Sequence, residues 1–492
     1  MGKRRPDSIM LDPSDNVRIL LMKKGSVPGG HKIATKDISN GGPIIKFGQP
    51  IGIAKKNISA GEHVHVHNVS FSDRINFKGI PLRSLSKRSS LPSSFSGYKR
   101  RDGRAGTRNY VAVIATVNCS ATVVAEVARH FDGASLKSGV DGVIPVIHSE
   151  GCAQGIGGYT YEILNRTLAG WLDHPNIVGA MVIGLGCEGT TFKSIMSHLS
   201  SKSRLDRKLV ESFNIQDAGG TKNAIKLGID KVKKILSKLP TYKRTNIPVA
   251  RLSVALNCGG SDAYSSITAN PALGIAADMI VANGGTVVLG ETPECFGGEK
   301  YLAARCASGS DRKKLHDIFS WWKKCGEFNF CTMNNNLSPG NIAGGITTIL
   351  EKSLGAIEKG GSTPIKQVLG YSERITKRGL VFMDTPGFDP VSVTGMIAGG
   401  CNVVAFTTGL GSVYGCSAAP TLKISSNTAV YNRLSDDMDI DAGRMISGIS
   451  IDDMARKIYL SIIAAAGGAR TKSEKNGIGR EEFAPWAAGE TL

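Results

Sequence analysis

Short apolar runs that end in tight polar clusters recur seven times along the chain, and each is a candidate β-strand. They lie at residues 114–117, 144–147, 181–183, 254–256, 287–289, 380–383 and 403–406. Their apolar residues are consecutive rather than alternate, which is typical of parallel strands buried on both faces. In α/β proteins, ligands bind beyond the carboxyl ends of such strands. The repeated polar ends therefore predict one shared site at the edge of a sheet.

Segments with helical spacing alternate with these runs. We expect helices over residues 121–131, 191–199, 223–236, 271–282 and 341–357. Strands that alternate with helices predict an α/β fold with a parallel sheet.

The N-terminal part differs, because it reads as short strands separated by glycine turns. The expected strands lie at 17–21, 32–34, 44–46 and 50–54. Residues 62–67 alternate with a period of two, which would place His63, His65 and His67 on one face. This part is predicted to be a small all-β module.

A chain of 492 residues is too long for one simple core. Residues 81–104 are rich in serine and basic residues and lack periodicity, so a flexible linker is expected there. The predicted domains are a β-domain at 1–80, a middle α/β domain at 105–245 and a C-terminal α/β domain at 246–492.

The chain shows no sign of a membrane span or a secretory signal. No stretch reaches the roughly 20 apolar residues of a membrane helix, and the basic N-terminus has no apolar stretch behind it. We therefore expect a cytoplasmic protein with reduced thiols. Several of the ten cysteines lie in polar or glycine-rich clusters, which favours metal binding or catalysis over disulfides.

Positive charge is concentrated in the N-terminal fifth of the chain. Residues 1–104 carry 20 Lys and Arg against 7 Asp and Glu, hence +13 of the total +19. A solvated basic surface, attraction of a small anionic substrate and nucleic-acid binding all remain open. Nucleic-acid binding has the least support, because zinc-finger spacing is absent and aromatic residues are few in this segment.

Thiol, imidazole and carboxylate groups follow the apolar runs, and together they suit Fe²⁺ or Zn²⁺. The metal candidates are Cys119, His148, Cys152, Cys187 and Cys258. The alternative is that these small residues only pack tight turns. Glu291 and Asp384 are candidate ligands or bases, although each can equally be a helix cap.

Two further motifs have both a functional and a purely structural interpretation. Gly184-x-Gly186-x-x-Gly189 has the form of a dinucleotide fingerprint, but the acidic residue expected about 20 positions later is poorly supplied. His31, His65 and His67 can bind a metal or transfer protons near neutral pH, or they can be satisfied structural histidines.

At these positions the chain resembles the altronate/galactarate dehydratase family of sugar-acid dehydratases. The resemblance covers nearly the whole chain, in order. It rests on motifs that include Gly-His-Lys-Ile-Ala (30–34), Val-His-Val-His-Asn (64–68), Arg-Asp-Gly-Arg-Ala-Gly-Thr-Arg-Asn-Tyr (101–110), Gly-Leu-Gly-Cys-Glu (184–188), Cys-Gly-Gly-Ser-Asp-Ala (258–263), Glu-Thr-Pro-Glu (291–294) and Phe-Met-Asp-Thr-Pro-Gly (382–387).

The resemblance implies an N-terminal β-clip (SAF) domain, a middle dimerisation domain and a C-terminal Rossmann-like parallel sheet that binds no dinucleotide. It implies a hydro-lyase that acts on altronate or galactarate, with Fe²⁺ as cofactor and Mn²⁺ as an alternative. A homodimer that takes a small anionic sugar acid is expected.

The resemblance also implies roles for particular residues. Catalysis or substrate handling is expected from His31, His65, His67, Glu291 and Asp384. Substrate binding is expected from Arg108, Asn109, Ser261, Asp262 and Lys423. One departure is Leu410, which stands where the family pattern has arginine; Lys423 or Arg433 are possible substitutes, and a non-catalytic anion-binding protein is the alternative to an enzyme.

Overall fold

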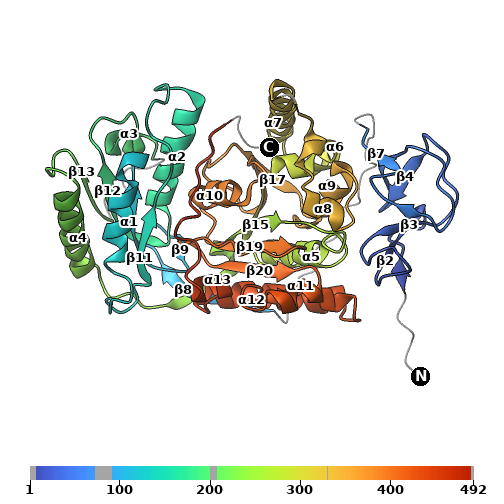
Figure 1. The fold of residues 1–492 in the computed structure, drawn as a ribbon. Coiled ribbons are helices and arrows are strands. Elements are labelled where there is room, and N and C mark those ends of the chain that lie inside the picture. Colours follow the sequence, from blue (N-terminus) through green and yellow to red (C-terminus); the bar gives the residue numbers. More distant parts are fainter. Residues whose placement is uncertain (1–6, 73–90, 200–207, 330, 489–492) are drawn as a thin grey trace.

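The computed structural model describes residues 7–72, 91–199, 208–329 and 331–488. The C-terminal domain stands between the middle domain on one side and the N-terminal domain on the other (Figure 1). Within the described ranges, no helix has both the length and the apolar character that crossing a membrane requires. The predicted α/β class with a small N-terminal β-domain is confirmed.

The N-terminal domain consists of short strands in two small sheets, ordered β1-β2-β3-β6 and β4-β5-β7. The strands are β1 Ser8–Ile9, β2 Val17–Leu20, β3 Lys32–Ala34, β4 Pro43–Lys46, β5 Gln49–Ala54, β6 His63–Val64 and β7 Val69–Ser70. The strand predicted over 62–67 is therefore only two residues long. Its apolar interior includes Ile44, Ile51 and Val64, none of which is exposed.

The predicted linker is wrong for the part that the structure describes. Residues 81–90 of it lie outside the described ranges. Farther along, β8 Ser94–Lys99 pairs antiparallel with β14 Thr245–Pro248 and also pairs with β9 Ala105–Gly106. Phe95 on β8 is buried in the core of the C-terminal domain, so this segment is part of the folded body.

The middle domain is a four-stranded parallel sheet ordered β11-β10-β12-β13. Its strands are β10 Tyr110–Ala115, β11 Gly142–Val146, β12 Ile177–Gly184 and β13 Leu209–Asn214. Alternate residues of β10 face opposite sides. Val111 and Val113 pack in the cluster of helices α1 Ala121–Arg129 and α4 Thr221–Lys238, whereas Ala112 and Ile114 pack toward α2 Tyr159–Asp173.

The C-terminal domain contains a seven-stranded parallel sheet ordered β17-β18-β16-β15-β19-β20-β21. Its strands are β15 Ser253–Gly259, β16 Thr286–Leu289, β17 Ile365–Leu369, β18 Gly379–Met383, β19 Val403–Thr408, β20 Thr421–Ser425 and β21 Ile440–Asp441. Helices α5 Ala269–Ala282 and α12 Ile451–Ala466 cover one face, and α10 Asp389–Gly399 covers the other. The remaining helices are α3 Phe192–Ser197, α6 Glu299–Arg305, α7 Gly309–Phe328, α8 Pro339–Ala343, α9 Ile349–Glu358, α11 Thr428–Arg433 and α13 Lys472–Lys475.

All seven apolar runs overlap strands, as predicted, but they divide between two sheets. Three belong to the middle sheet and four to the C-terminal sheet. Helices α2 and α10 join the two domains, and Trp171 Nε1 donates to Thr394 O at 3.1 Å across this junction. The prediction of one shared edge is therefore wrong, because the strand ends form two edges.

The helix predicted over 341–357 is broken into α8 and α9. Gly345 adopts φ +93°, a left-handed conformation that favours glycine, and Thr348 caps α9 by accepting from Glu351 N. A Cβ on Gly345 would lie 2.9 Å from Gly30 O of the N-terminal domain. The break is thus the place where the N-terminal domain docks.

Candidate active site

Two buried lysines of the N-terminal domain meet one glutamate of α9 at the docking surface. Lys32 Nζ lies 2.8 Å, and Lys46 Nζ 2.7 Å, from the Glu351 carboxylate. Burial alone would raise the pKa of Glu351, but the two ammonium groups hold it well below its usual value. Burial lowers the pKa of Lys32 to about 8. The two domains are therefore joined by a dry ionic contact.

Four histidine rings gather beside this contact. The His63 ring lies 5.2 Å from His31, 5.3 Å from His65 and 5.4 Å from His67, measured between ring centroids. His31 Nε2 hydrogen-bonds Ala343 O at 3.1 Å, and His65 Nε2 hydrogen-bonds Ile342 O at 2.9 Å. Burial, reinforced by the neighbouring imidazoles, lowers the pKa of His63 to about 4. The predicted imidazole face exists, and it lies against α8.

A second charged group lies at the carboxyl ends of β15 and β16, fully inside the protein. Cys258 Sγ is 2.6 Å from Lys359 Nζ and 3.0 Å from Glu294 Oε2. Lys359 Nζ is 2.5 Å from Glu291, and Lys352 Nζ is 2.8 Å from Glu294. The two lysines are seven residues apart on α9 and its end, so they lie on one side of the helix. We call these five residues the Cys258 cluster.

The backbone of Glu291 is strained. It has φ +61° and ψ +57°, a left-handed conformation that is uncommon for residues with a side chain. Its N–H donates to Thr385 Oγ1 at 2.6 Å, and its carboxylate accepts from Cys258 N at 3.0 Å. Strain of this kind concentrates at functional sites, and here it directs the carboxylate at Lys359.

Burial perturbs the acids of this cluster in different directions. Burial raises the pKa of Glu291 to about 7, against the effect of Lys359 and with that of Glu294. Burial would also raise the pKa of Glu294, but Lys352 and Lys359 hold it below its usual value. Burial beside both carboxylates raises the pKa of Cys258 well above its ordinary value. One carboxyl group can therefore exchange a proton near neutral pH.

Asp384 and Asp389 support the cluster from neighbouring segments. Asp384 Oδ1 accepts from Thr292 Oγ1 at 2.6 Å and from Trp322 Nε1 at 2.7 Å. Burial raises its pKa to about 6. Asp389 Oδ1 accepts from Asn257 Nδ2 at 2.9 Å. Asp384 thus anchors the short 3₁₀ helix Thr292–Cys295, which carries Glu294.

Cys258, Glu291 and Glu294 have ligand atoms within 4.8 Å of one another, and they are the only such metal-compatible group in the described part of the chain. Their donor types suit Fe²⁺ or Mn²⁺. However, Lys359 Nζ lies within 2.6 Å of both the thiol and the Glu291 carboxylate. Two lysines already neutralise the two carboxylates, and the thiol is held neutral. As arranged, the cluster does not fit a divalent ion.

Of the five predicted metal ligands, only Cys258 belongs to this group. Cys119, His148, Cys152 and Cys187 lie at the carboxyl edge of the middle sheet instead. His148 is buried, and its ring nitrogens are engaged by Ala115 O at 3.0 Å and by Glu150 N at 3.1 Å. The structure does not bring the five together.

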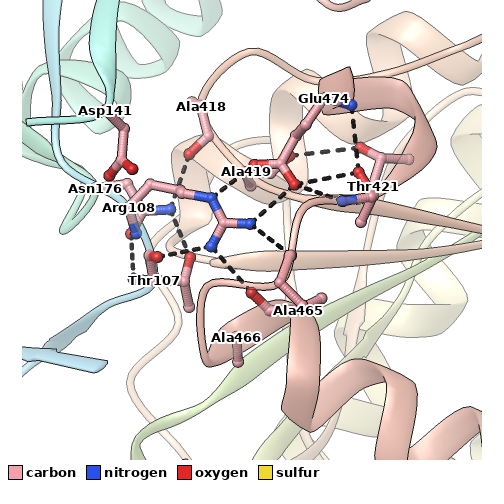
Figure 2. Close-up of polar contacts among 12 residues, drawn as sticks. Thr107, Arg108, Asp141, Asn176, Ala418, Ala419, Thr421, Ala465, Ala466 and Glu474 are labelled. Atoms are coloured by element: carbon pink, nitrogen blue, oxygen red, sulfur yellow. Dashed lines mark hydrogen bonds and ion pairs between the residues drawn. The ribbon is translucent and has the colours of Figure 1, made fainter. Parts of the chain in front are cut away.

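Arg108 and Asn109, predicted to bind substrate, lie between the middle and C-terminal domains. Arg108 Nε and Nη2 donate to the Glu474 carboxylate at 2.6 and 2.8 Å, and its other contacts are backbone carbonyls such as Ala465 O (Figure 2). Asn109 Nδ2 donates to Gly139 O at 2.6 Å. Both side chains are buried and join structural elements.

Two other predicted substrate residues, Ser261 and Asp262, contact the segment around α8 on which the N-terminal domain docks. Asp262 accepts from Ser426 Oγ at 2.8 Å and Asn427 Nδ2 at 3.0 Å, and Ser261 O accepts from Asn341 Nδ2 at 2.8 Å. Lys423 is buried in β20, with Nζ 3.5 Å from Asp437.

Leu410, the residue that departs from the family pattern, packs beside these loops. A Cβ on Gly260 or Gly340 would contact the Leu410 side chain. Arg433 is exposed and its Nη2 donates to Leu410 O at 3.4 Å. The Arg433 guanidinium group therefore lies next to the backbone of Leu410.

The loop at 184–189 contains a carboxylate where a dinucleotide phosphate would lie. Glu188 accepts from Leu185 N at 3.1 Å and Gly186 N at 2.6 Å. A Cβ on Gly184 would lie 2.2 Å from its Oε1. Because the loop N–H groups already bind this side chain, the dinucleotide interpretation is not supported.

Sequence reasoning missed Lys352, Lys359 and His63 as site residues. The two lysines reach the cluster because α9 packs over the sheet. The sequence around a helical lysine does not indicate that the lysine will contact a distant strand end. The alternation over 62–67 places His63 on the same face as His65 and His67 but indicates no role for it. Its ring centroid separations show that it belongs with the other histidines.

Comparison with known protein families matches three consecutive parts of the chain. Residues 16–72 match the altronate/galactarate dehydratase SAF domain. Residues 97–240 match the second domain of D-galactarate dehydratase/altronate hydrolase, and residues 249–491 match the C-terminal D-galactarate/altronate dehydratase domain.

Individual relatives are similar over nearly their whole length. Altronate dehydratase of Bacillus subtilis is 34% identical, covering 95% of this chain and 93% of that protein. Altronate dehydratase of Escherichia coli is 35% identical, covering 97% and 94%. Galactarate dehydratase (L-threo-forming) of E. coli is 32% identical, covering 96% and 95%.

Proposed function

The chain belongs to the altronate/galactarate dehydratase family, whose members are hydro-lyases, and we propose that its own substrate is D-altronate. Support for this substrate comes from the two altronate dehydratases, at 34% and 35% identity against 32% for galactarate dehydratase. The observation that carries the proposed chemistry is the buried Cys258 cluster at the edge of the C-terminal sheet.

Dehydration of a 2,3-dihydroxy acid removes the C2 proton and the C3 hydroxyl group. The C2 proton is weakly acidic, so a base and stabilisation of the enediolate-like state are both needed. Glu291 is the proposed base, because burial brings its pKa to about 7. The ammonium group of Lys359 stabilises the developing negative charge. The C3 hydroxyl takes up one proton, which balances the proton that Glu291 removes from C2, and leaves as water. The enol then tautomerises to 2-dehydro-3-deoxy-D-gluconate.

The cluster is closed in this arrangement. The cavity beside it, between Lys46 and Lys352, measures only about 10 Å³, too small for a sugar acid. The proposed route of substrate entry is separation of the SAF domain from α8 and α9. The four histidines that lie on this contact are proposed to handle the substrate when the domain closes again.

The iron requirement implied by the family resemblance is a further part of the proposal, as is a homodimer. Fe²⁺, or Mn²⁺ in its place, would act as a Lewis acid. No step above runs through it, because the Cys258 cluster, with Lys359 Nζ within 2.6 Å of both the thiol and the Glu291 carboxylate, does not fit a divalent ion as arranged. Gel filtration with light scattering tests the dimer.

Turnover measured anaerobically in the presence of Fe²⁺ tests the function. We expect 2-keto-3-deoxy product from D-altronate at a higher kcat/KM than from galactarate. Glu291→Gln should lower kcat at least about 100-fold, as expected for loss of a general base. Glu211→Gln, on the surface of the middle domain, is the matched control. Absence of turnover with both acids, or an active Glu291→Gln variant, contradicts the proposal.

A further inference from the structure

A cavity of about 480 Å³ lies between the middle and C-terminal domains. Helix α2 contributes one wall. The first residues of β15 and β16 contribute another, together with segment 372–378, which joins β17 to β18. Small-molecule sites in proteins occupy about 300–1,000 Å³ and are common at domain junctions. The cavity is therefore large enough to hold a small metabolite.

The cavity is a different site from the Cys258 cluster. Ser253, the first residue of β15, lines the cavity, whereas Cys258 lies five residues later on the same strand. A strand rises about 3.3 Å per residue, so the two positions are roughly 16 Å apart. The C-terminal sheet is parallel, so its strands present the cavity at their amino ends and the cluster at their carboxyl ends.

Positive charge dominates the lining of the cavity, with six basic side chains against two acidic ones. The basic residues are Arg104, Arg166, Arg251, Arg374, Lys377 and Arg378. Both acids already have basic partners. Asp173 lies 2.9 Å from Arg104 and 3.1 Å from Arg374, and Glu373 lies 2.6 Å from Lys314. The lining therefore keeps an excess of positive charge.

Three of the six basic residues form no ion pair with any carboxylate in the described part of the chain, namely Arg166, Arg251 and Arg378. Arg251 and Arg378 are exposed, and Lys377, beside Arg378, lies 3.8 Å from Asp311. A cleft lined by one sign of charge concentrates ligands of the opposite sign. The unpaired guanidinium groups therefore favour an anion in the cavity.

The guanidinium group of Arg166 is held in place by a strained turn. Its Nε donates to Ser372 Oγ at 3.2 Å, and its Nη2 donates to Tyr371 O at 2.7 Å. Ser372 is buried and has φ +55°, a left-handed conformation that is uncommon for residues with a side chain. These contacts use two of the three nitrogens, and Nη1 remains for a ligand.

We propose that this cavity binds a small molecule that carries two phosphate groups. The planar fork of arginine binds phosphate through two parallel hydrogen bonds. A phosphate monoester carries about −1.5 to −2 charges near neutral pH, so two of them match three guanidinium groups. The ligand would contact Arg166 of the middle domain and Arg251 and Arg378 of the C-terminal domain, and would join the two. This site does not rest on D-altronate being the substrate.

Isothermal titration calorimetry on the full chain, at low ionic strength and without added metal, tests the proposal. The probes are inorganic pyrophosphate, whose phosphate groups are adjacent, and fructose 1,6-bisphosphate, whose groups are separated. We expect one molecule of at least one probe to bind per chain and to raise the unfolding temperature; the probe that binds more tightly indicates the spacing. Each of Arg251→Met and Arg378→Met should raise Kd at least about tenfold, as expected for loss of a charge-assisted contact.

Arg444→Met, at an exposed arginine outside the cavity, is the matched control and should bind as the parent does. Because Arg251 and Arg378 are exposed, their variants should unfold at the parent temperature without ligand. Glu291→Gln should keep probe binding while losing turnover, so failure of the proposed function is distinguishable. Absence of binding by both probes overturns the proposal. Equal affinity for citrate, unchanged Kd in both cavity variants, or an equal loss in Arg444→Met also overturns it.

Discussion

Replacing Lys359 with methionine tests whether charge holds the Cys258 cluster together. Methionine keeps much of the side-chain length and removes the ammonium group that lies 2.5 Å from Glu291. Lys359 and Glu291 are 0% and 1% exposed, so water cannot replace the lost partner. Removing one member of a buried ion pair is destabilising by about 3–5 kcal/mol. Since Lys352 still neutralises Glu294, we expect a loss of about 3 kcal/mol in the free energy of unfolding.

The loss should depend on pH with a defined sign. The pKa of Glu291 is already raised to about 7 by burial, and losing Lys359 raises it further. Above the ordinary pKa of 4.5 the folded variant then binds a proton that the unfolded chain does not. Stability falls with rising pH wherever the folded state binds more protons. The urea midpoint of Lys359→Met should therefore be higher at pH 6 than at pH 8, measured by tryptophan fluorescence.

A double-mutant cycle isolates the interaction from loss of packing. Adding Glu291→Gln to Lys359→Met removes the orphaned charge, and we expect recovery of about 2 kcal/mol. Lys231→Met, which breaks a partly exposed pair with Glu211, should change stability by less than about 1 kcal/mol. A Lys359→Met variant as stable as the parent at both pH values, with no coupling to Glu291, would refute the reasoning.

Three other outcomes are expected. Burial lowers the pKa of His63 from 6.5 to about 4, so between pH 4 and pH 6.5 the unfolded chain binds more protons than the folded chain. The urea midpoint of unfolding should therefore fall as the pH drops from 6.5 to 5. This dependence of the midpoint on pH should be weaker in His63→Gln. Arg108→Met should lower the free energy of unfolding by about 3 kcal/mol, because it removes the buried ion pair with Glu474, and it should leave KM unchanged. A raised KM at unchanged stability would instead support a substrate-binding role for Arg108. Arg433→Ala should raise KM for altronate about tenfold, the effect of losing one charge-assisted hydrogen bond, and leave kcat unchanged. Arg444→Ala, at another exposed arginine, is the control. Equal KM values for the two variants would show that Arg433 does not bind the substrate.

The apolar runs were sufficient to predict the strands but not their partners. Val254 and Leu256 face one helix layer and Ala255 the other, so a continuous run correctly indicated burial on two faces. Which strands share a sheet depends on tertiary pairing, and an apolar run carries no such information. The helix predicted over 341–357 failed for a local reason, since Gly344 and Gly345 interrupt its periodicity and end α8.

The candidate site was predictable only where polar residues directly follow strands. Cys258 and Glu291 were found in this way. Lys359 contributes the central positive charge of the cluster, but it lies at a helix end about a hundred residues from Cys258, and no local pattern links the two. Arg108 shows a different limit. Its motif indicates that the arginine is needed, but the motif does not distinguish a residue that binds substrate from one that forms an ion pair with Glu474.

The contact of Lys32 and Lys46 with Glu351 has a consequence for motion. Three charges removed from water lose hydration that their mutual attraction only partly returns. Opening restores that hydration, so the ionic part of the contact opposes separation less than an apolar contact of the same area, whereas the apolar residues of α9 packed with the N-terminal domain hold the surfaces together. Since both surfaces belong to one polypeptide, their rebinding is intramolecular and does not depend on protein concentration. If the SAF domain separates, it therefore closes again as one molecule rather than as two partners that must meet by diffusion.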